Sequence, residues 1–322
     1  MGCLFMDEYS FKDVLTGSDV TCSYPYLQSV VIENTQGALP CESIFFPGCS
    51  FINYALPLVK AVYDTLLTSG SVQGISLLCC GKILSYEEDG QAKRDAFEVQ
   101  LCEHLKKAGV KRIIAACPNC VTALRNACAK DEEAAKIDIV ALPAELARLG
   151  YRIDIPTAQA LAAPETGCDN TIFCPHDSCP DRQTGEFAQG VRDLLGEGAY
   201  VERAHNRKKS TCCGSLTRAA GNFDGANKAA NFCGKESLAA GAQAIVTVCM
   251  SCSFLLTALQ NSLPVFHYLE LLYNWRIDWV HSDAYMKLRF LFDESLGAVV
   301  KKAGKRNFVA LDVEGEIDNH QA

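Results

Sequence analysis

The sequence predicts an α/β protein with two pseudo-symmetric, Rossmann-like halves and parallel sheets, the product of an internal duplication. The first observation is a repeat: residues 109–120 and 241–252 share a glycine, an apolar run and a Cys-x-x-Cys pair, about 130 positions apart. The second is a Cys-Cys-Gly tripeptide that recurs at nearly the same distance, at 79–81 and 212–214. The third is an alternation of short apolar runs with helical patterns, which is typical of parallel sheets with crossover helices.

The first copy alternates strand-like and helix-like segments. Short apolar runs that end just before a cysteine predict strands, and longer stretches of helical pattern predict helices. In chain order the expected elements are a strand at 45–46, a helix at 56–69, a strand at 76–78, a helix at 94–108, a strand at 111–116 and a helix at 121–130. The second copy is expected to close with a strand at 244–248 and a helix at 254–260.

The two Cys-x-x-Cys pairs follow directly after predicted strands, where helices begin. In open parallel sheets the carboxyl ends of the strands form the edge at which ligands bind. The N-terminus of a helix adds free N–H groups and partial positive charge, which favour thiolates and anionic groups. The pattern therefore places cysteines where a ligand site is expected.

The repeat also predicts the domain organisation. The first cysteine-rich domain is expected at 44–155 and the second at 168–275. Residues 1–43 form an N-terminal extension and residues 276–322 a C-terminal helix and tail, neither of which the repeat explains. Within the tail, a serine-capped amphipathic helix is expected at 282–303.

Composition limits the class of protein. The chain has 322 residues, a net charge of −8 and 18 cysteines. The negative charge argues against nucleic-acid binding, and the lack of a long apolar run argues against direct membrane insertion. The N-terminus has no basic segment followed by an apolar stretch, so a cytoplasmic protein is expected. In a reducing compartment, this many thiols predict a metal site rather than disulfides.

Each copy offers five candidate metal ligands: one cysteine, then the vicinal pair, then Cys-x-x-Cys. Cys174 competes with Cys179 for the first position of the second copy, and Cys179 keeps the repeat spacing more closely. Cys102, Cys128 and Cys233 are expected to be small buried hydrophobic residues instead. The predicted ligands are Cys49, Cys79, Cys80, Cys117 and Cys120 (the first cysteine set) and Cys179, Cys212, Cys213, Cys249 and Cys252 (the second cysteine set).

Iron–sulfur clusters fit these sets better than zinc does. A structural zinc ion takes four ligands, one fewer than each copy offers. Two adjacent cysteines chelate a single ion with difficulty, whereas in a cluster they can reach different irons. The glycine after each pair is expected to let the backbone come close to the cluster, with a positive φ. Zinc in one of the two copies is the alternative.

The doubled motif resembles the cysteine-rich CCG domains found in one subunit of heterodisulfide reductases and in the relatives of that subunit. The resemblance rests on Pro-Gly-Cys at 47–49, Cys-Pro-Asn-Cys at 117–120, His-Asp-Ser-Cys at 176–179, Cys-Met-Ser-Cys at 249–252 and the two Cys-Cys-Gly tripeptides, and it covers about 230 residues. In the heterodisulfide-reductase branch each five-cysteine motif binds a non-cubane 4Fe–4S cluster, and a disulfide substrate is cleaved between the two clusters. The resemblance therefore implies two 4Fe–4S clusters in this chain.

The resemblance further implies an oxidoreductase subunit of the disulfide-reductase type, active only with partners. The chain lacks the ferredoxin motifs that related respiratory and lactate-type subunits often carry, so electrons are expected from a ferredoxin-like iron–sulfur subunit and a flavoprotein subunit. A small-molecule disulfide or thiol is the expected substrate. The alternative is an electron-transfer subunit of a 2-hydroxy-acid (lactate or glycolate) or succinate/fumarate dehydrogenase, with no substrate site of its own. A zinc-stabilised scaffold is a third interpretation.

Two residues beside the cysteines are candidate catalytic residues. Lys82 follows the first Cys-Cys-Gly and could supply positive charge to an anionic substrate, or it could be a surface ion-pairing residue. His176 lies three residues before Cys179 and could donate a proton to a departing thiolate, or it could hydrogen bond to the loop backbone. Arg182 and Arg218 have weaker claims of the same kind. The sequence contains no phosphate-binding loop or dinucleotide fingerprint, so no bound nucleotide is expected.

Overall fold

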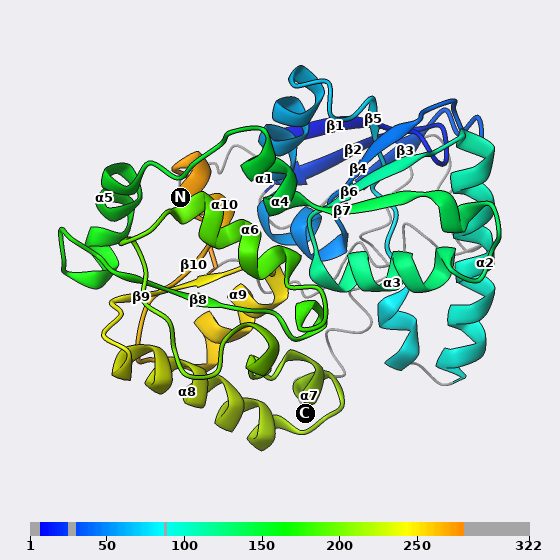
Figure 1. Cartoon of the computed structure of the whole chain (residues 1–322). Helices are drawn as coiled ribbons and strands as arrows, with labels where there is room; N and C mark the ends of the chain where they lie inside the picture. Colours follow the sequence, from blue (N-terminus) through cyan, green and yellow to red (C-terminus); the bar gives the residue numbers. More distant parts are fainter. Residues whose placement is uncertain (1–6, 25–29, 87–88, 280–322) are drawn as a thin grey trace, which may run out of the picture. The chain divides into compact units, whose positions relative to one another are not determined.

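The predicted fold class is confirmed. A computed structural model describes residues 7–24, 30–86 and 89–279 (Figure 1). They divide into two compact units, one containing the chain up to Ile114 together with Ala123–Ile139, the other containing Ala115–Thr122 and Val140–Trp279. The described residues form two sheets, and the division between the units passes through the strands at 112–115 and 138–141 and the helix at 118–128. The expected helix at 282–303 lies outside the described residues.

The first unit is built on a seven-stranded sheet with the order β3-β2-β1-β5-β4-β6-β7. β4 and β5 are parallel, as the duplicated pattern predicts. The strands are β1 (Asp7–Asp13), β2 (Ser18–Tyr24), β3 (Val30–Glu33), β4 (Ser43–Phe46), β5 (Gly74–Ile75), β6 (Arg112–Ala115) and β7 (Asp138–Ala141). The helices of this part of the chain are α1 (Cys49–Thr68), η1 (Lys82–Tyr86), α2 (Gly90–Ala108), α3 (Pro118–Cys128) and η2 (Ala134–Lys136).

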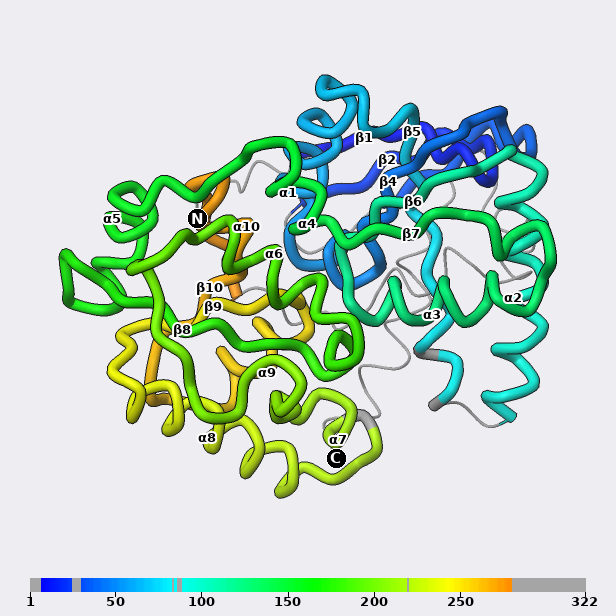
Figure 2. Tube along the Cα trace, in the orientation of Figure 1, coloured from blue at the N-terminus to red at the C-terminus, as the bar shows by residue number. Residues whose placement is uncertain are grey.

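The N-terminal extension completes the first sheet. β1, β2 and β3 form an antiparallel meander, and β1 adds to β5 in parallel through Asp13 and Ile75 (Figure 2). Asp13 is buried at the end of β1, and its carboxylate accepts hydrogen bonds from the Leu77 backbone N–H at 2.6 Å and the Ser76 hydroxyl at 3.1 Å. The extension thereby fixes the segment that leads into Cys79.

The predicted strand at 76–78 is wrong, because β5 ends at Ile75. The physical reason is the bond from Leu77 to Asp13: this backbone N–H is bound by a carboxylate and is not available to a neighbouring strand. The apolar residues Leu77 and Leu78 are nevertheless buried, which is why the segment resembled a strand.

The second unit contains three parallel strands in the order β10-β9-β8. The register places His176, Thr247 and His267 side by side at the carboxyl ends of the three strands. The strands are β8 (Phe173–His176), β9 (Ala244–Thr247) and β10 (Val265–His267). The helices are α4 (Leu142–Arg148), α5 (Ile155–Thr166), η3 (Cys179–Asp181), α6 (Glu186–Leu195), η4 (Arg207–Lys209), α7 (Ser215–Ala219), α8 (Phe223–Ala239), α9 (Met250–Leu259) and α10 (Tyr268–Tyr273).

Most expected elements are present, but several helices begin earlier than the sequence indicated. α1 begins at Cys49 rather than at 56. A short helical stretch before the kink at Ala55 is continuous with the expected helix, which contains Pro57. Proline suits the first turn of a helix, so the sequence favoured a start near Pro57. None of the helices in the described residues is long and apolar enough to cross a membrane.

Candidate metal centre

The second cysteine set lies at the carboxyl ends of β8 and β9 and in the loop before α7. Cys179 begins η3 just after β8, and the vicinal pair precedes the N-cap of α7. Cys249 is the N-cap of α9, and Cys252 lies in the first turn of that helix. The predicted position of this Cys-x-x-Cys pair, at the end of a strand and the beginning of a helix, is confirmed.

The five thiols of the second cysteine set form a continuous network of sulfur contacts. Cys212 hydrogen bonds to Cys179 and Cys213. Cys213 in turn contacts Cys252, which contacts Cys249. Cys213, Cys249 and Cys252 are buried, whereas Cys179 and Cys212 are only partly buried. The set therefore has a closed side and a side that solvent reaches.

Hydrogen bonding within the network separates thiolates from thiols. Hydrogen bonds from Cys179 and Cys213, with help from the Gly214 backbone N–H at 3.3 Å, lower the pKa of Cys212 to about 2. Contacts from Cys117 and Cys252 likewise hold the pKa of Cys249 well below its usual range. The Cys213 and Cys252 thiols keep their protons, because hydrogen bonding to neighbouring thiolates raises their pKa values. A metal centre would let all five lose their protons, since its positive charge compensates the thiolates.

The competing Cys174 lies apart from this network. It is buried inside β8, where burial raises the pKa of its thiol and the Arg203 backbone hydrogen bonds to it. Cys179 is the residue whose thiol contacts Cys212. The choice of Cys179 as the first ligand of the second set stays a prediction.

His176 lies at the end of β8 beside the second cysteine set. Its side chain is 1% exposed, and both ring nitrogens have no hydrogen-bond partner in the described part of the chain. One ring nitrogen and the sulfurs of Cys213 and Cys252 all lie within 4.8 Å of one another. Burial, reinforced by the nearby charge of Arg203, lowers the pKa of His176 to about 3, so the imidazole is neutral at pH 7. Its predicted role as a proton donor stays a prediction.

The loop between His176 and Cys179 is anchored by a buried ion pair. Both oxygens of Asp177 accept hydrogen bonds from the Arg192 guanidinium, at 2.7 and 2.9 Å, and each side chain is 1% exposed. Arg192 also binds Glu202 at 2.6 Å, and the Arg207 backbone N–H donates to Asp177. This network was missed at the level of sequence, because its members are far apart in the chain.

In the first unit, the structure brings three members of the first cysteine set together. Cys49 begins α1, and its sulfur lies 3.9 Å from that of Cys79. Cys79 also hydrogen bonds to Cys80, and these contacts together with burial raise the pKa of the Cys79 thiol. Cys117 and Cys120 lie at the end of β6 and the beginning of α3, in the segment that belongs to the second unit, where Cys117 contacts Cys249.

The other predicted site residues have ordinary surroundings. Lys82 begins η1 and is partly buried. Arg182 donates a hydrogen bond to the Ser210 hydroxyl at 3.3 Å, and Arg218 lies over the ring of Phe223. The catalytic role suggested for Lys82 stays a prediction.

Glycine follows each vicinal pair because of tight packing as well as backbone geometry. Gly81 has φ +70° and Gly214 has φ +98°, which confirms the expected positive φ. A Cβ at Gly81 would lie 2.4 Å from the Phe97 ring, and one at Gly214 would lie 2.8 Å from the Ala226 carbonyl oxygen. At both glycines, the atoms that lie close to the backbone belong to other residues of the chain, Phe97 and Ala226.

Replacing Gly81 with alanine is expected to destabilise the chain more than the same change at Gly109. Both have positive φ, which costs a non-glycine residue about 1–2 kcal/mol, but a Cβ at Gly109 meets nothing within 4 Å. The clash with Phe97 should add about 1–3 kcal/mol. Urea unfolding of the two variants measures the difference, and equal losses of stability would contradict the packing argument.

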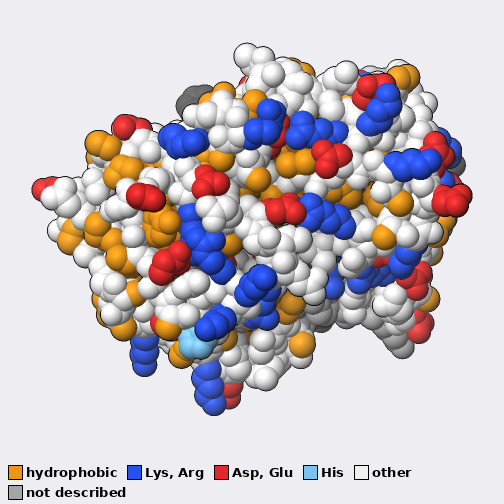
Figure 3. Space-filling view, in the orientation of Figure 1, with side chains coloured by type: hydrophobic (Ala, Val, Ile, Leu, Met, Phe, Trp, Pro, Cys, Tyr) orange, Lys and Arg blue, Asp and Glu red, His pale blue; other side chains and the backbone are white. Residues whose placement is uncertain are grey.

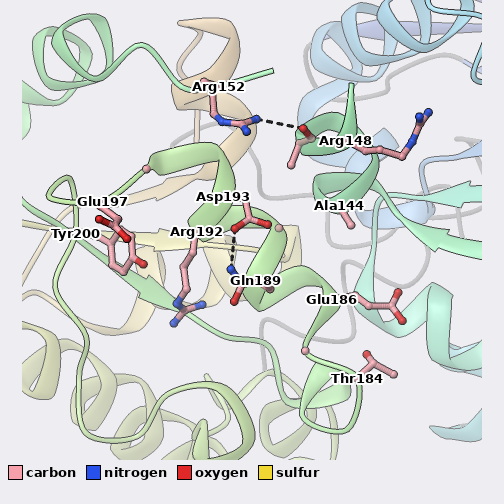
Figure 4. Close-up of a pocket in the computed structure, with 14 residues that line it drawn as sticks. Ala144, Arg148, Arg152, Thr184, Glu186, Gln189, Arg192, Asp193, Glu197 and Tyr200 are labelled. Carbon is pink, nitrogen blue, oxygen red and sulfur yellow. Dashed lines mark hydrogen bonds between the residues drawn. The ribbon is translucent and has the colours of Figure 1, made fainter. Parts of the chain in front are cut away.

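A recess on the second unit is separate from the metal centre. It has a volume of about 780 Å³ and is lined by residues of α4, of α6 and of the segments next to these helices, including Arg152, Gln189 and Tyr200 (Figure 4). None of the cysteines lines it. Acidic and basic side chains are interspersed on the face drawn in Figure 3. The cysteine sets, and not this recess, therefore remain the candidate site for metal binding.

Comparison with known proteins gives a family match. A family model described as the CCG cysteine-rich domain matches residues 43–125 and again residues 174–257. No curated protein matches the sequence. Among solved structures, the glutamate racemase RacE1 of Bacillus anthracis is 12% identical with a TM-score of 0.30, covering 82% of this chain and 83% of its own. A putative Asp/Glu racemase of Yersinia pestis is 13% identical with a TM-score of 0.32, covering 75% and 98%. Likenesses this weak carry no argument.

Proposed function

We infer, from the premise that this chain belongs to the CCG cysteine-rich domain family, that it is the iron–sulfur redox subunit of a heterodisulfide-reductase-like complex. The two matched regions together make up more than half of the chain. Cysteine-rich domains of this kind indicate iron–sulfur electron transfer. The finer proposal is that the substrate is a small-molecule disulfide or thiol.

The sulfur network of the second cysteine set is the observation that carries this proposal. Five thiols linked in series by sulfur contacts, with the pKa of Cys212 lowered to about 2, are donors suited to iron. The partly buried Cys179 and Cys212 give a small molecule a side from which to approach. A 4Fe–4S cluster bound there would supply one-electron redox chemistry, and the chain's own residues would hold it in place and keep water from its buried side.

The proposal extends to the first cysteine set and to partner proteins. Cys49, Cys79 and Cys80 are clustered in the first unit and would contribute to a second 4Fe–4S cluster, with zinc as the alternative occupant of one copy. Electrons would come from a ferredoxin-like subunit and a flavoprotein subunit, in the cytoplasm. A relay subunit of a 2-hydroxy-acid or succinate/fumarate dehydrogenase is the competing function.

Metal analysis of protein purified without oxygen tests the cofactor. About eight irons with matching sulfide are expected per chain, and replacing Cys168, a partly buried cysteine outside both sets, with serine should leave that number unchanged. Adding a disulfide or thiol should then change the electron paramagnetic resonance spectrum. Zinc without sulfide would contradict the redox proposal, and loaded protein with no response to any thiol or disulfide would favour the relay.

A further inference from the structure

His176 is placed so that its ring lies against the thiols of the second cysteine set. One ring nitrogen lies within 4.8 Å of the sulfurs of Cys213 and Cys252, which are themselves in contact. The thiolates of Cys212 and Cys249 also act electrostatically on the ring. Four of the five sulfurs in the set are thus neighbours of one imidazole.

The protein fixes the position of the His176 ring, but the described residues provide no hydrogen-bond partner for its nitrogens. His176 pairs with Thr247 in the β8–β9 ladder, and the next residue, Asp177, is held by Arg192, so the backbone at this point is fixed on both sides. Both ring nitrogens are fully buried, yet neither has a hydrogen-bond partner in the described residues. Buried polar groups in proteins are almost always paired, so an orphaned imidazole indicates a ligand that the chain itself does not provide.

The neighbouring His267 shows the contrast. It ends β10 in the same row as His176, and it is equally buried. Its Nδ1 accepts a hydrogen bond from the Leu269 backbone N–H in the capping box of α10. His267 therefore has a structural role as the cap of α10, whereas the described residues offer His176 no such hydrogen bond.

We propose that His176 is a nitrogen ligand of the metal centre held by the second cysteine set, bound beside Cys213 and Cys252. Neutral imidazole is a good ligand for iron and zinc, and mixed histidine–cysteine ligation occurs in both zinc and iron–sulfur sites. This inference rests on the proposed function, because it assigns a ligand to the cluster proposed there. In this proposal His176 binds the metal centre and is not the proton donor that the sequence suggested.

Pulsed electron paramagnetic resonance on protein labelled with ¹⁵N-histidine tests the ligand. The reduced, cluster-loaded wild type should show strong hyperfine coupling to a histidine nitrogen. His176→Leu, which keeps an apolar side chain of similar size, should lose that coupling. His267→Asn should keep it, since asparagine preserves the helix cap and removes the other buried imidazole.

A second probe does not depend on the cluster. Apo-protein loaded with Co²⁺ alone should show a mixed nitrogen and sulfur shell by X-ray absorption, and a sulfur-only shell in His176→Leu. Loaded wild-type protein without nitrogen coupling, or coupling lost in His267→Asn and kept in His176→Leu, would overturn the assignment. Failure of the proposed function is distinguishable from failure of this assignment, because the protein would then either hold no iron and sulfide or hold clusters that respond to no thiol or disulfide, whatever the nitrogen coupling shows.

Discussion

Replacing Arg192 with methionine is expected to lower the free energy of unfolding by about 3–5 kcal/mol, the usual cost of removing one partner of a buried ion pair. The change leaves Asp177 buried at 1% exposure without the guanidinium that binds both of its oxygens. Glu202 also loses its 2.6 Å partner. Urea unfolding of the cluster-loaded chain, followed by circular dichroism, measures the loss.

Lys60→Met is the matched control. Lys60 pairs with Asp64 on the surface of α1, with side chains 41% and 51% exposed, so this loss should stay below about 1 kcal/mol. If the two variants lost the same stability, the buried network would not be what holds the loop between His176 and Cys179.

The same Arg192 variant should lose the part of the protein's acid sensitivity that comes from Asp177. Burial alone would raise the pKa of Asp177, but hydrogen bonds and charge from Arg192 hold it below its usual value. A depressed folded-state pKa means that the stabilisation is complete above about pH 4 and is lost as pH falls through the folded value. Without Arg192, burial dominates and the pKa of Asp177 rises, so this carboxyl binds its proton more readily in the folded chain than in the unfolded chain. The stability gap between the wild type and Arg192→Met should therefore narrow as pH falls through about 4, and urea unfolding at several pH values measures it. A gap that widens in acid would contradict this argument.

Much of the fold could be predicted because the same pattern of apolar runs and cysteines occurs twice in the sequence. The apolar runs before Cys117 and Cys249 are short and end at cysteines, and both are strands followed by helices. The N-terminal extension could not be predicted in this way, because β1, β2 and β3 have no counterpart among the described residues of the second copy. Its role depends on Asp13, whose partners at Ser76 and Leu77 are distant in sequence.

The surroundings of the cysteines were less predictable than their positions. Spacing favoured Cys179 over Cys174; the Cys179 thiol contacts Cys212, whereas Cys174 lies inside β8, and the choice of ligand stays a prediction. Spacing gives no information on which ring nitrogens are satisfied, so the orphaned imidazole of His176 became visible only in three dimensions. The Asp177–Arg192 pair follows the same rule, since a buried charge pair joins a strand end to a helix that the sequence pattern treats separately.

Cys179→Ser and Cys174→Ser test the assignment of the second cysteine set most directly. Cys179→Ser is expected to reduce iron from about eight to about four per chain, because a sulfur ligand that contacts Cys212 is lost while the first cysteine set is untouched. Cys174→Ser should keep about eight irons, since Cys174 is buried inside β8 beside the Arg203 backbone, where serine can keep a hydrogen bond.

Iron and sulfide content of anaerobically purified variants is the measurement, with circular dichroism to show that each variant is folded. The opposite pattern, iron lost from Cys174→Ser and retained in Cys179→Ser, would move the first ligand into β8. That result would also remove the reason for the anchored loop, because Asp177 and Arg192 hold the segment that carries Cys179 and have no comparable effect on a residue fixed inside the sheet. The pair of variants therefore decides which cysteine binds the metal centre. If it is Cys179, the buried charge pair that holds the loop between His176 and Cys179 holds a metal ligand.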